Sequence, residues 1–236
     1  MTTADDAAQA AAELAARALA QRAIAAGDPT GWFEPLYQAA KAGQVRVPWD
    51  RHAPSQLLVS WAADRALSSG SLLPSGQPRT ALVVGCGLGD DAEFIAGLGF
   101  RTTAFDISPS AIEGAQRRFP ESVVDYCVAD LMAPPARWRL AYDLVIESLT
   151  LQALPEPARG RATGQLAPLV ARGGTLIVFA RGRPPGIADD GPPWSLTRSQ
   201  IDAIAAGVLT PVHIDEIAIP DSTAAWRWRA EFRRKP

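Results

Sequence analysis

The sequence has 236 residues, 47% of them apolar, and a formal net charge of −2 at pH 7. This length is typical of one α/β domain with a short extension, and the apolar share is sufficient for a sizeable core. Proteins that bind a nucleic-acid backbone usually carry a basic excess. Here arginines gather only near the end, between Arg227 and Lys235, so nucleic acid is not expected as the main partner.

Cysteine usage and the first residues indicate the cellular setting. Cys86 and Cys127 do not form a C-x-x-C pair, so neither a disulfide framework nor a metal site is expected. The start, MTTADDAAQA, is acidic and lacks the basic and apolar segments of a signal peptide. No apolar run reaches the roughly 18 residues of a membrane span. We expect a cytoplasmic protein without a membrane partner; the sequence does not indicate its oligomeric state.

Residues 1–79 differ in composition from the rest of the chain. Residues 1–27 are rich in alanine, the best helix former, and predict one or two helical pieces. Aromatic residues concentrate in residues 31–56, and a helix from Ser55 to about Ala66 and a Pro/Gly/Ser-rich loop follow. We interpret residues 1–79 as an N-terminal helical extension that forms a lid over a site; a poorly ordered amino end is the alternative for residues 1–27.

From residue 80 onward, strand patterns alternate with helical ones. Apolar strand segments are expected at residues 81–84, 102–105, 123–128, 142–146, 175–180, 212–219 and 225–232. Helical patterns are expected at residues 90–98, 108–119, 155–170 and 196–206, with Gly173-Gly174 closing the third of them. This alternation argues for a parallel sheet, and the short link at residues 220–223 makes the last two strands an antiparallel hairpin. Residues 80–236 are therefore predicted to form an α/β core: a Rossmann-like, mainly parallel seven-stranded sheet with helices on both faces.

The sharpest local signal is a glycine turn, Gly85-Cys86-Gly87-Leu88-Gly89, with a strand before it and a helix after it. Glycines permit a tight turn and close approach of a ligand to the backbone. The dinucleotide fingerprint is G-x-G-x-x-G, whereas this turn is G-x-G-x-G followed by Asp90 and Asp91. Two acids at a helix start repel a pyrophosphate and attract an ammonium group, which favours S-adenosylmethionine (SAM) over a nicotinamide cofactor. A tight turn without a ligand is the alternative.

Two further carboxylates follow predicted strands. Asp106 closes the second strand, where a carboxylate can accept hydrogen bonds from both hydroxyls of a ribose. Asp130 closes the third strand and is followed by Leu131 and Met132, a pattern that suits an adenine amine and ring. The alternative for each acid is a cap in an ordinary loop. The three strand ends together predict a ligand along the carboxyl edge of the sheet.

Four runs carry a family resemblance: ALVVGCGLGDDAEFIAGLGFRTTAFDISPSAIEGAQRRF, CVADL, YDLVIESLTLQALP and GGTLIVFARG. With them, the chain from Thr80 to its end resembles class I SAM-dependent methyltransferases. A shorter upstream match, Trp32 and the run VPWD at residues 47–50 with Pro54, resembles the thiopurine, thiol and halide methyltransferase branch.

The resemblance implies SAM as cofactor, S-adenosylhomocysteine as product and a set of cofactor contacts. These are Trp32, Trp49, Gly85, Cys86, Gly87, Asp106, Ile107, Asp130, Leu131, Glu147 and Ser148. Asp106 would hold the ribose and Asp130 with Leu131 the adenine, while Glu147 and Ser148 would lie near the methionine part. Val83 stands where many class members carry an acid. The methionine ammonium must then be held by backbone carbonyls or by another acid.

Methyl transfer from a sulfonium requires alignment of the acceptor and exclusion of water, and no metal. A thiol ionises near neutral pH, whereas a hydroxyl needs a general base, for which His52 is the candidate catalytic residue. Aromatic residues outside the expected core predict a small, aromatic or hydrophobic acceptor, with a thiol favoured. The residues expected to bind it are Phe33, Tyr37, His52, Arg181 and Trp194.

Two rival functions stay open at this point. One is O- or N-methylation of a small heterocyclic natural product or toxin. The other is a non-catalytic SAM-binding protein, because such methyltransferases need no indispensable catalytic side chain. An NAD(P)-dependent reductase is disfavoured by the spacing of the glycines.

Overall fold

The computed structural model describes residues 3–69, 79–187, 189, 191–219 and 225–236. At its centre is a seven-stranded sheet in the order β3-β2-β1-β4-β5-β7-β6. The first five strands are parallel, and β7 runs antiparallel between β5 and β6. The predicted Rossmann-like sheet with an antiparallel carboxyl-terminal pair is thereby confirmed. The strands are β1 (Thr80–Val84), β2 (Arg101–Asp106), β3 (Asp125–Val128), β4 (Tyr142–Ser148), β5 (Val170–Arg181), β6 (Leu209–Ala218) and β7 (Trp226–Arg234).

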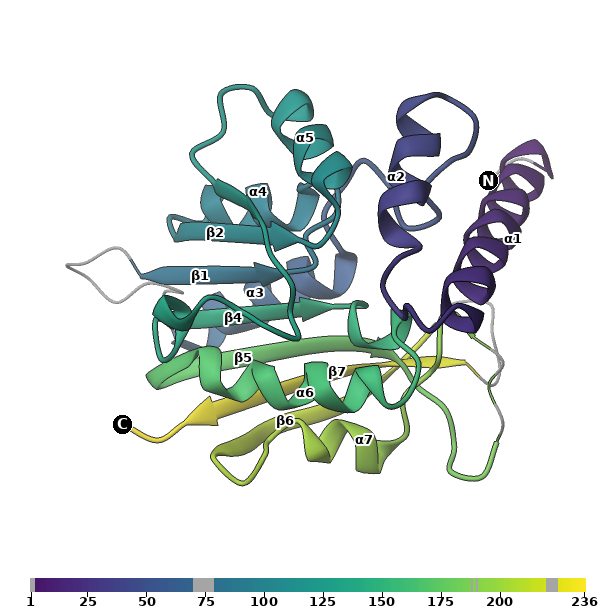
Figure 1. Ribbon diagram of the computed structural model, residues 1–236. Coiled ribbons are helices and arrows are strands. Elements are labelled where there is room, and N and C mark those ends of the chain that lie inside the picture. The colour runs from purple at the N-terminus through teal and green to yellow at the C-terminus, as the bar shows by residue number, and fades with distance from the viewer. Residues whose placement is uncertain (1–2, 70–78, 188, 190, 220–224) are drawn as a thin grey trace.

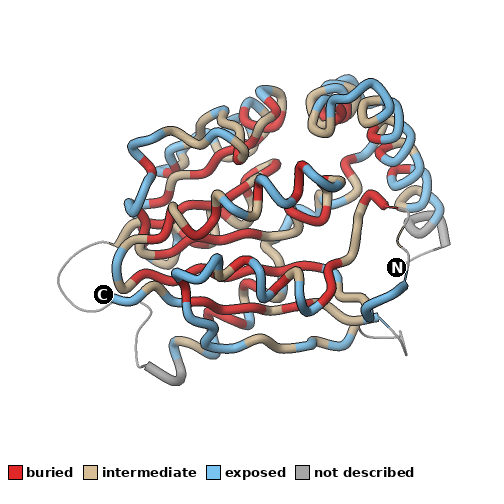
Figure 2. The backbone as a smooth tube through the Cα atoms, turned by 60° about the horizontal axis from the view of Figure 1, so that its bottom comes forward, coloured by how far each residue is buried: buried red, intermediate tan, exposed pale blue. Residues whose placement is uncertain are grey.

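Helices cover both faces of the sheet. In Figure 1, α6 (Ala158–Leu169) and α7 (Arg198–Ala203) lie in front of it, and α3 (Gln56–Ser69) and α4 (Asp90–Gly97) lie behind it. Alternate residues of each strand supply the two cores, because successive side chains point to opposite faces. In β1 the buried side chains divide in this way, Leu82 and Val84 packing with α6 and α7, and Ala81 and Val83 with α3 and α4. Figure 2 shows the buried residues following the strands through the middle of the molecule.

The amino-terminal helices stand at the end of the sheet to which the parallel strands point (Figure 1). α1 (Thr3–Ala25) is one continuous helix, and its small residues Ala16 and Ala20 pack on Trp32 and Leu36. α2 (Phe33–Lys41) was not predicted, although Phe33, Leu36 and Tyr37 follow a helical period. These elements therefore border the carboxyl edge of the sheet. Among the described residues, none of the helices has the length and apolar character needed to cross a membrane.

The start of β5 corrects one sequence prediction. Gly173-Gly174 does not close α6, because α6 ends at Leu169 and β5 begins at once. A side chain at Gly174 would come within 3.0 Å of the Tyr142 carbonyl and 3.1 Å of the Asp143 carbonyl. The glycine therefore permits close approach of β4 rather than capping a helix. The predicted link at residues 220–223 lies outside the described residues.

The helix α5 (Pro109–Arg118) begins as the sequence predicted. Ser108, one of two expected caps, accepts a hydrogen bond from the Ala111 backbone through its hydroxyl, and Pro109 occupies the first turn. This cap satisfies one of the free N–H groups at the helix start. Since Ser108 follows β2 by two residues, the cap also fixes the strand end at Asp106.

Candidate functional site

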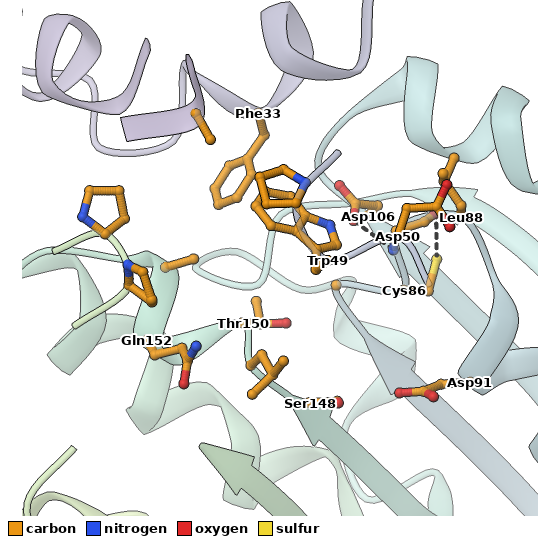
Figure 3. Close-up of a pocket in the computed structure, with 18 of the residues that line it drawn as sticks. Phe33, Trp49, Asp50, Cys86, Leu88, Asp91, Asp106, Ser148, Thr150 and Gln152 are labelled. Atoms are coloured by element: carbon orange, nitrogen blue, oxygen red, sulfur yellow. Dashed lines mark hydrogen bonds between the residues drawn. The ribbon is translucent and has the colours of Figure 1, made fainter. Parts of the chain in front are cut away.

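A cavity of about 400 Å³ opens at the carboxyl ends of the parallel strands. Figure 3 shows labelled side chains from the aromatic segment, the glycine turn and the end of β4 meeting around it. Of the residues predicted for the site, those that line the cavity are Trp32, Phe33, Tyr37, Trp49, Gly85, Cys86, Gly87, Asp106, Ile107, Asp130, Leu131, Ser148 and Arg181. Glu147, His52 and Trp194 do not line it.

The glycine turn closes against the end of β2 and under the aromatic segment. Cys86 donates its backbone N–H to the Phe105 carbonyl at 2.9 Å. Gly87 has a φ of +54°, and a side chain there would lie 2.9 Å from the Tyr37 hydroxyl. Only glycine tolerates both conditions without strain. The glycine therefore permits the close approach of Tyr37 to a turn whose residues line the cavity.

Asp106 at the end of β2 is buried, with 6% of its surface exposed. Its two carboxylate oxygens accept backbone hydrogen bonds from Gly87 (3.0 Å) and Ser108 (2.9 Å). Burial raises the pKa of Asp106 to about 6, although these hydrogen bonds oppose the rise. A carboxylate has about four acceptor positions. Asp106 therefore holds the glycine turn and keeps acceptor capacity toward the cavity.

Asp130 and Leu131 lie together at the end of β3. Asp130 accepts the backbone N–H of Met132 at 2.8 Å through one oxygen. Leu131 is buried against Phe105 and other residues of the front core while it lines the cavity. One carboxylate oxygen and one apolar surface therefore stand side by side, as an amine-bearing aromatic ring requires.

Asp91 and Ser148 form the opposite wall, side by side in Figure 3. Asp91 accepts the Ser55 backbone N–H at 2.7 Å. Burial raises the pKa of Asp91, and hydrogen bonds from Ser55 and from the Ser148 side chain oppose the rise. Its neighbour Asp90 instead pairs with Arg118 at 2.8 Å. Of the two acids after the glycine turn, it is therefore Asp91 that presents negative charge without a basic partner among the described residues.

Glu147 has a different position from the one predicted. Its side chain is fully buried below the cavity and accepts the backbone N–H groups of Thr150 (2.6 Å) and Leu151 (2.9 Å). Burial raises the pKa of Glu147 to about 7. The sequence placed it at a strand end correctly, but the side chain points toward the following turn. Glu147 therefore supports the turn Leu151–Ala153 instead of contacting a ligand.

The aromatic side chains before and within α2 form a roof. Trp32 and Phe33 stack with ring centroids 4.0 Å apart, and Trp49 meets Trp32 edge-on at 6.0 Å. Trp49 also donates its indole N–H to the Tyr37 hydroxyl at 2.9 Å. These contacts hold the roof as one unit over the glycine turn.

Glu34 attaches this roof to the core. Its carboxylate accepts hydrogen bonds from the Ser108 hydroxyl (2.5 Å), the Ser110 hydroxyl (2.7 Å) and the Ser110 backbone (3.0 Å). Burial opposes ionisation of Glu34, but these hydrogen bonds and one from Gln38 outweigh it and lower its pKa. An ionised Glu34 therefore holds α2 on the first turn of α5.

Two acceptor-side predictions need correction. His52 has a left-handed backbone with a φ of +52°, a 73% exposed side chain and Asp50 at 3.6 Å. It faces away from the cavity, so the structure gives no support for His52 as a base or as an acceptor contact.

Trp194 packs its ring over Gly191 and donates its backbone N–H to the Gln152 carbonyl at 2.7 Å. It shapes the loop behind the cavity wall.

Among the cavity residues that sequence reasoning missed, Thr150, Gln152 and Arg227 connect several elements of the fold. Thr150 donates its hydroxyl to the Val84 carbonyl at 3.1 Å, which ties the turn after β4 to β1. Gln152 accepts the Arg181 backbone N–H at 2.7 Å through its side-chain oxygen. Arg227, at the start of β7, lines the cavity opposite Arg181. The order of the strands, which no local pattern gives, brings these residues together.

Comparison with known proteins agrees with this geometry. Residues 81–174 match the family model described as a methyltransferase domain. An Arabidopsis thaliana protein named "Probable thiol methyltransferase 2" shares 26% identity over 211 residues, 89% of this chain and 84% of that protein.

Two solved structures are similar over most of the chain. One, from work on conversion of a disulfide bond into a thioacetal group during echinomycin biosynthesis, has 25% identity, a TM-score of 0.64 and coverage of 86% of this chain and 93% of the other. An N-methyltransferase from Bradyrhizobium japonicum WM9, in complex with S-adenosyl-L-homocysteine, has 22% identity, a TM-score of 0.61 and coverage of 85% and 98%.

Proposed function

We propose that this chain, which belongs to the class I SAM-dependent methyltransferases, methylates the sulfur of a small aromatic or hydrophobic thiol. The observation that carries the proposal is one shared cavity, which an open glycine turn, buried strand-end carboxylates and an aromatic roof all line. The name of the Arabidopsis relative supports sulfur as the acceptor atom.

The residues of the cavity fit SAM. Asp106 would accept the ribose hydroxyls, and Asp130 with Leu131 would hold the adenine. Asp91 would bind the methionine ammonium, the role for which the sequence offers no acid at Val83. Gly85, Cys86 and Gly87, which line the cavity beside these acids, would pack on the cofactor. Bound there, SAM supplies an activated methyl group on a sulfonium.

The remaining work of the chain is to align the acceptor and exclude water, and such positioning can contribute about 7–11 kcal/mol to a rate. The stacked roof of Trp32 and Phe33 would exclude water from one side. Ser148 and Leu149 at the end of β4 would separate the cofactor region from the acceptor region. We accordingly propose the part of residues 1–79 that precedes α3 as the lid, and residues 80–236, with α3 packed on their sheet, as the SAM-binding core.

The side chains of the cavity favour an acceptor that needs no general base. Among the described residues that line it, none is a histidine. Burial raises the pKa of Tyr37 well above its ordinary value, so this phenol stays protonated. Thiols ionise near neutral pH in water. A thiolate would therefore enter as the reactive form, whereas a hydroxyl would need a carboxylate of the cavity as its base, and Asp91, Asp106 and Asp130 are proposed to bind the cofactor.

N-methylation of a small heterocycle is the second candidate. A ring nitrogen also needs no base, since its lone pair is available at neutral pH. The fold is shared with an N-methyltransferase from Burkholderia thailandensis that was crystallised with 1,6-didemethyltoxoflavin. This candidate predicts the same cofactor contacts and differs only in the acceptor atom.

Product analysis on matched acceptors tests the proposal. Benzenethiol, phenol and pyridine are incubated separately with the protein and SAM, and products are identified by mass spectrometry. We expect methylation of benzenethiol, with S-adenosylhomocysteine formed in equal amount. Reactions with S-adenosylhomocysteine in place of SAM are the control. Methylation of pyridine alone would replace the thiol proposal by the second candidate, and binding of SAM without turnover of any acceptor would contradict both.

A further inference from the structure

The part of the cavity farthest from the glycine turn contains a group of arginines. Arg181, the last residue of β5, lies directly opposite Arg227 in the antiparallel β5–β7 pair, and Arg51 reaches the cavity from the segment after Trp49. Like charges directly opposite on neighbouring strands are destabilising. An anion bound between these arginines would offset this cost.

None of the three guanidinium groups has a carboxylate partner among the described residues, although other arginines do. On the same strand, Arg229 pairs with Asp64 at 2.7 Å and Asp215 at 3.2 Å. The Nε atom of Arg227 is buried and has no hydrogen-bond partner. Burial, followed by the charges of Arg51 and Arg181, lowers the pKa of Arg227. A buried donor left without a partner is costly, so a nearby anion would stabilise the guanidinium of Arg227, a residue that lines the cavity.

The position of the arginines separates them from the proposed cofactor contacts. In the sheet order β1-β4-β5-β7, Arg181 and Arg227 lie two and three strands beyond the glycine turn. Neighbouring strands are about 4.8 Å apart, which places them about 10 and 14 Å across the sheet from β1. Asp91 and Ser148, proposed to meet the methionine end, lie between. The arginines therefore border the space left for the acceptor.

The other walls of this region indicate the rest of the ligand. Pro192 and Pro193 line it from the loop after β5, and Leu149 and Leu154 line it from the turn after β4. Such a wall suits a flat apolar body. With its side-chain oxygen occupied by the Arg181 backbone, Gln152 has its amide N–H groups left as further donors.

We propose that Arg181 and Arg227, with Arg51 beside them, bind an anionic group, a carboxylate or its equivalent, on the acceptor. The acceptor is then an aryl thiol with a negative charge at the end remote from its sulfur. This inference rests on the proposed function for the thiol, whereas the anion site can be measured without turnover.

The test compares 4-mercaptobenzoate with 4-mercaptobenzamide, which has the same shape and no charge. In the parent protein we expect kcat/KM to favour the acid by at least about tenfold, as for a charge-assisted pair. Arg227→Gln and Arg181→Gln should bring this ratio close to one, mainly by raising KM for the acid, and should leave the amide unchanged. Arg233→Gln, an exposed change on the same strand, is the control that should keep the ratio.

Three results would overturn the anion site. The parent may turn over acid and amide equally, or the arginine variants may slow both alike. The variants may instead weaken S-adenosylhomocysteine by the same factor as the acid, which would assign the arginines to the cofactor's carboxylate. If neither thiol is methylated, calorimetry with 4-chlorobenzoate and 4-chlorobenzamide on the protein saturated with S-adenosylhomocysteine decides the matter. Binding of the acid alone, lost in Arg227→Gln, supports the site; equal binding or none refutes it.

Discussion

The cavity has two halves that are built in different ways: a cofactor half, where SAM is proposed to bind, and an acceptor half, where the thiol is proposed to bind. In the cofactor half, backbone N–H groups of the next few residues or of a neighbouring turn hold Asp106 and Asp130 in place. In the half proposed to bind the acceptor, Arg181 and Arg227 come from strands that are distant in sequence, and neither has a carboxylate partner among the described residues. Hydrogen bonds within the protein therefore fix the carboxylates of the cofactor half before a ligand arrives. In the acceptor half, the charges of the arginines are left for the ligand to balance.

The sharpest test of this contrast is Asp106→Ala. The change removes the proposed ribose acceptor, and hydrogen bonds to a charged group contribute about 1.5–3 kcal/mol each. We expect affinity for S-adenosylhomocysteine to fall at least about a hundredfold in calorimetric titration. Because Asp106 also holds the glycine turn, thermal unfolding must first show that the variant is folded.

Asp125→Ala provides the matched control, since Asp125 is exposed at the start of the neighbouring strand. It should bind the product as the parent does. NADH should bind to none of the three proteins. A folded Asp106→Ala variant with parental affinity would contradict the proposal that the cofactor binds at Asp106.

The sequence predicted well which strand-end residues line the proposed cofactor half, because short sequence patterns are enough to locate strand ends. β1 runs into the glycine turn, β2 ends in Asp106 and β4 ends in Ser148, and the carboxyl ends of parallel strands meet at one edge. This pattern placed Asp106 and Ser148 at the cavity without knowledge of strand order. Glu147 shows the limit of the pattern, since the strand end was predicted correctly but the side chain turned to the following backbone.

The acceptor half was predicted less well because its residues were chosen by type. His52 was selected as one of two histidines, yet its left-handed backbone turns it toward Asp50 and solvent. Arg227 was assigned to an exposed strand face, and only the placement of β7 beside β5 brings it opposite Arg181. Trp194 was expected to border the acceptor, whereas it packs over Gly191. Long-range topology therefore decided the place of Arg227, whereas local backbone geometry decided those of His52 and Trp194.

Glu147 connects the two halves, and Glu147→Gln tests that connection through pH. Its carboxylate supports the turn that carries Thr150 to β1 and Gln152 to Arg181. Burial raises its pKa from the ordinary 4.5 to about 7 in the folded protein. The folded state therefore binds more protons than the unfolded chain between these two values, and the stability contributed by Glu147 is lost as pH rises through that window.

We expect the free energy of unfolding of Glu147→Gln to increase by about 1–3 kcal/mol relative to that of the parent between roughly pH 5 and pH 8, because the parent loses stability over this range and the variant does not. Urea denaturation at several pH values measures this difference. Glu121→Gln, at an exposed position, should show no such trend. A difference that stays constant with pH would mean that Glu147 is ionised alike in the folded and unfolded states.

Gly87→Ala tests how closely the roof approaches the cofactor half. The new methyl group would lie 2.9 Å from the Tyr37 hydroxyl, at a residue whose φ is +54°. We expect about a tenfold loss of affinity for S-adenosylhomocysteine, because backbone strain of this kind costs on the order of 1–3 kcal/mol. Adding Tyr37→Phe should recover part of the loss.

The control is Gly97→Ala, at the end of α4, where the new methyl group meets nothing within 4 Å. It should bind the product as the parent does. Equal effects of the two glycine changes would show that Tyr37 and the rest of the roof lie away from the glycine turn when the ligand is bound.

The smallest expected effect distinguishes two contacts between α2 and α5. The Glu34 carboxylate accepts three hydrogen bonds from Ser108 and Ser110 in a partly buried position, and Ser108 adjoins the end of β2. Lys41 and Glu113 form an ion pair 2.8 Å long, but their side chains are 51% and 53% exposed. Exposed ion pairs contribute only about 0–1 kcal/mol, so the second contact should matter little.

Glu34→Gln should raise KM for SAM about three- to fivefold, since it weakens charge-assisted hydrogen bonds without removing them. Glu113→Gln, the control, should leave KM unchanged. Equal KM values in both variants would mean that the roof is held by its aromatic contacts alone.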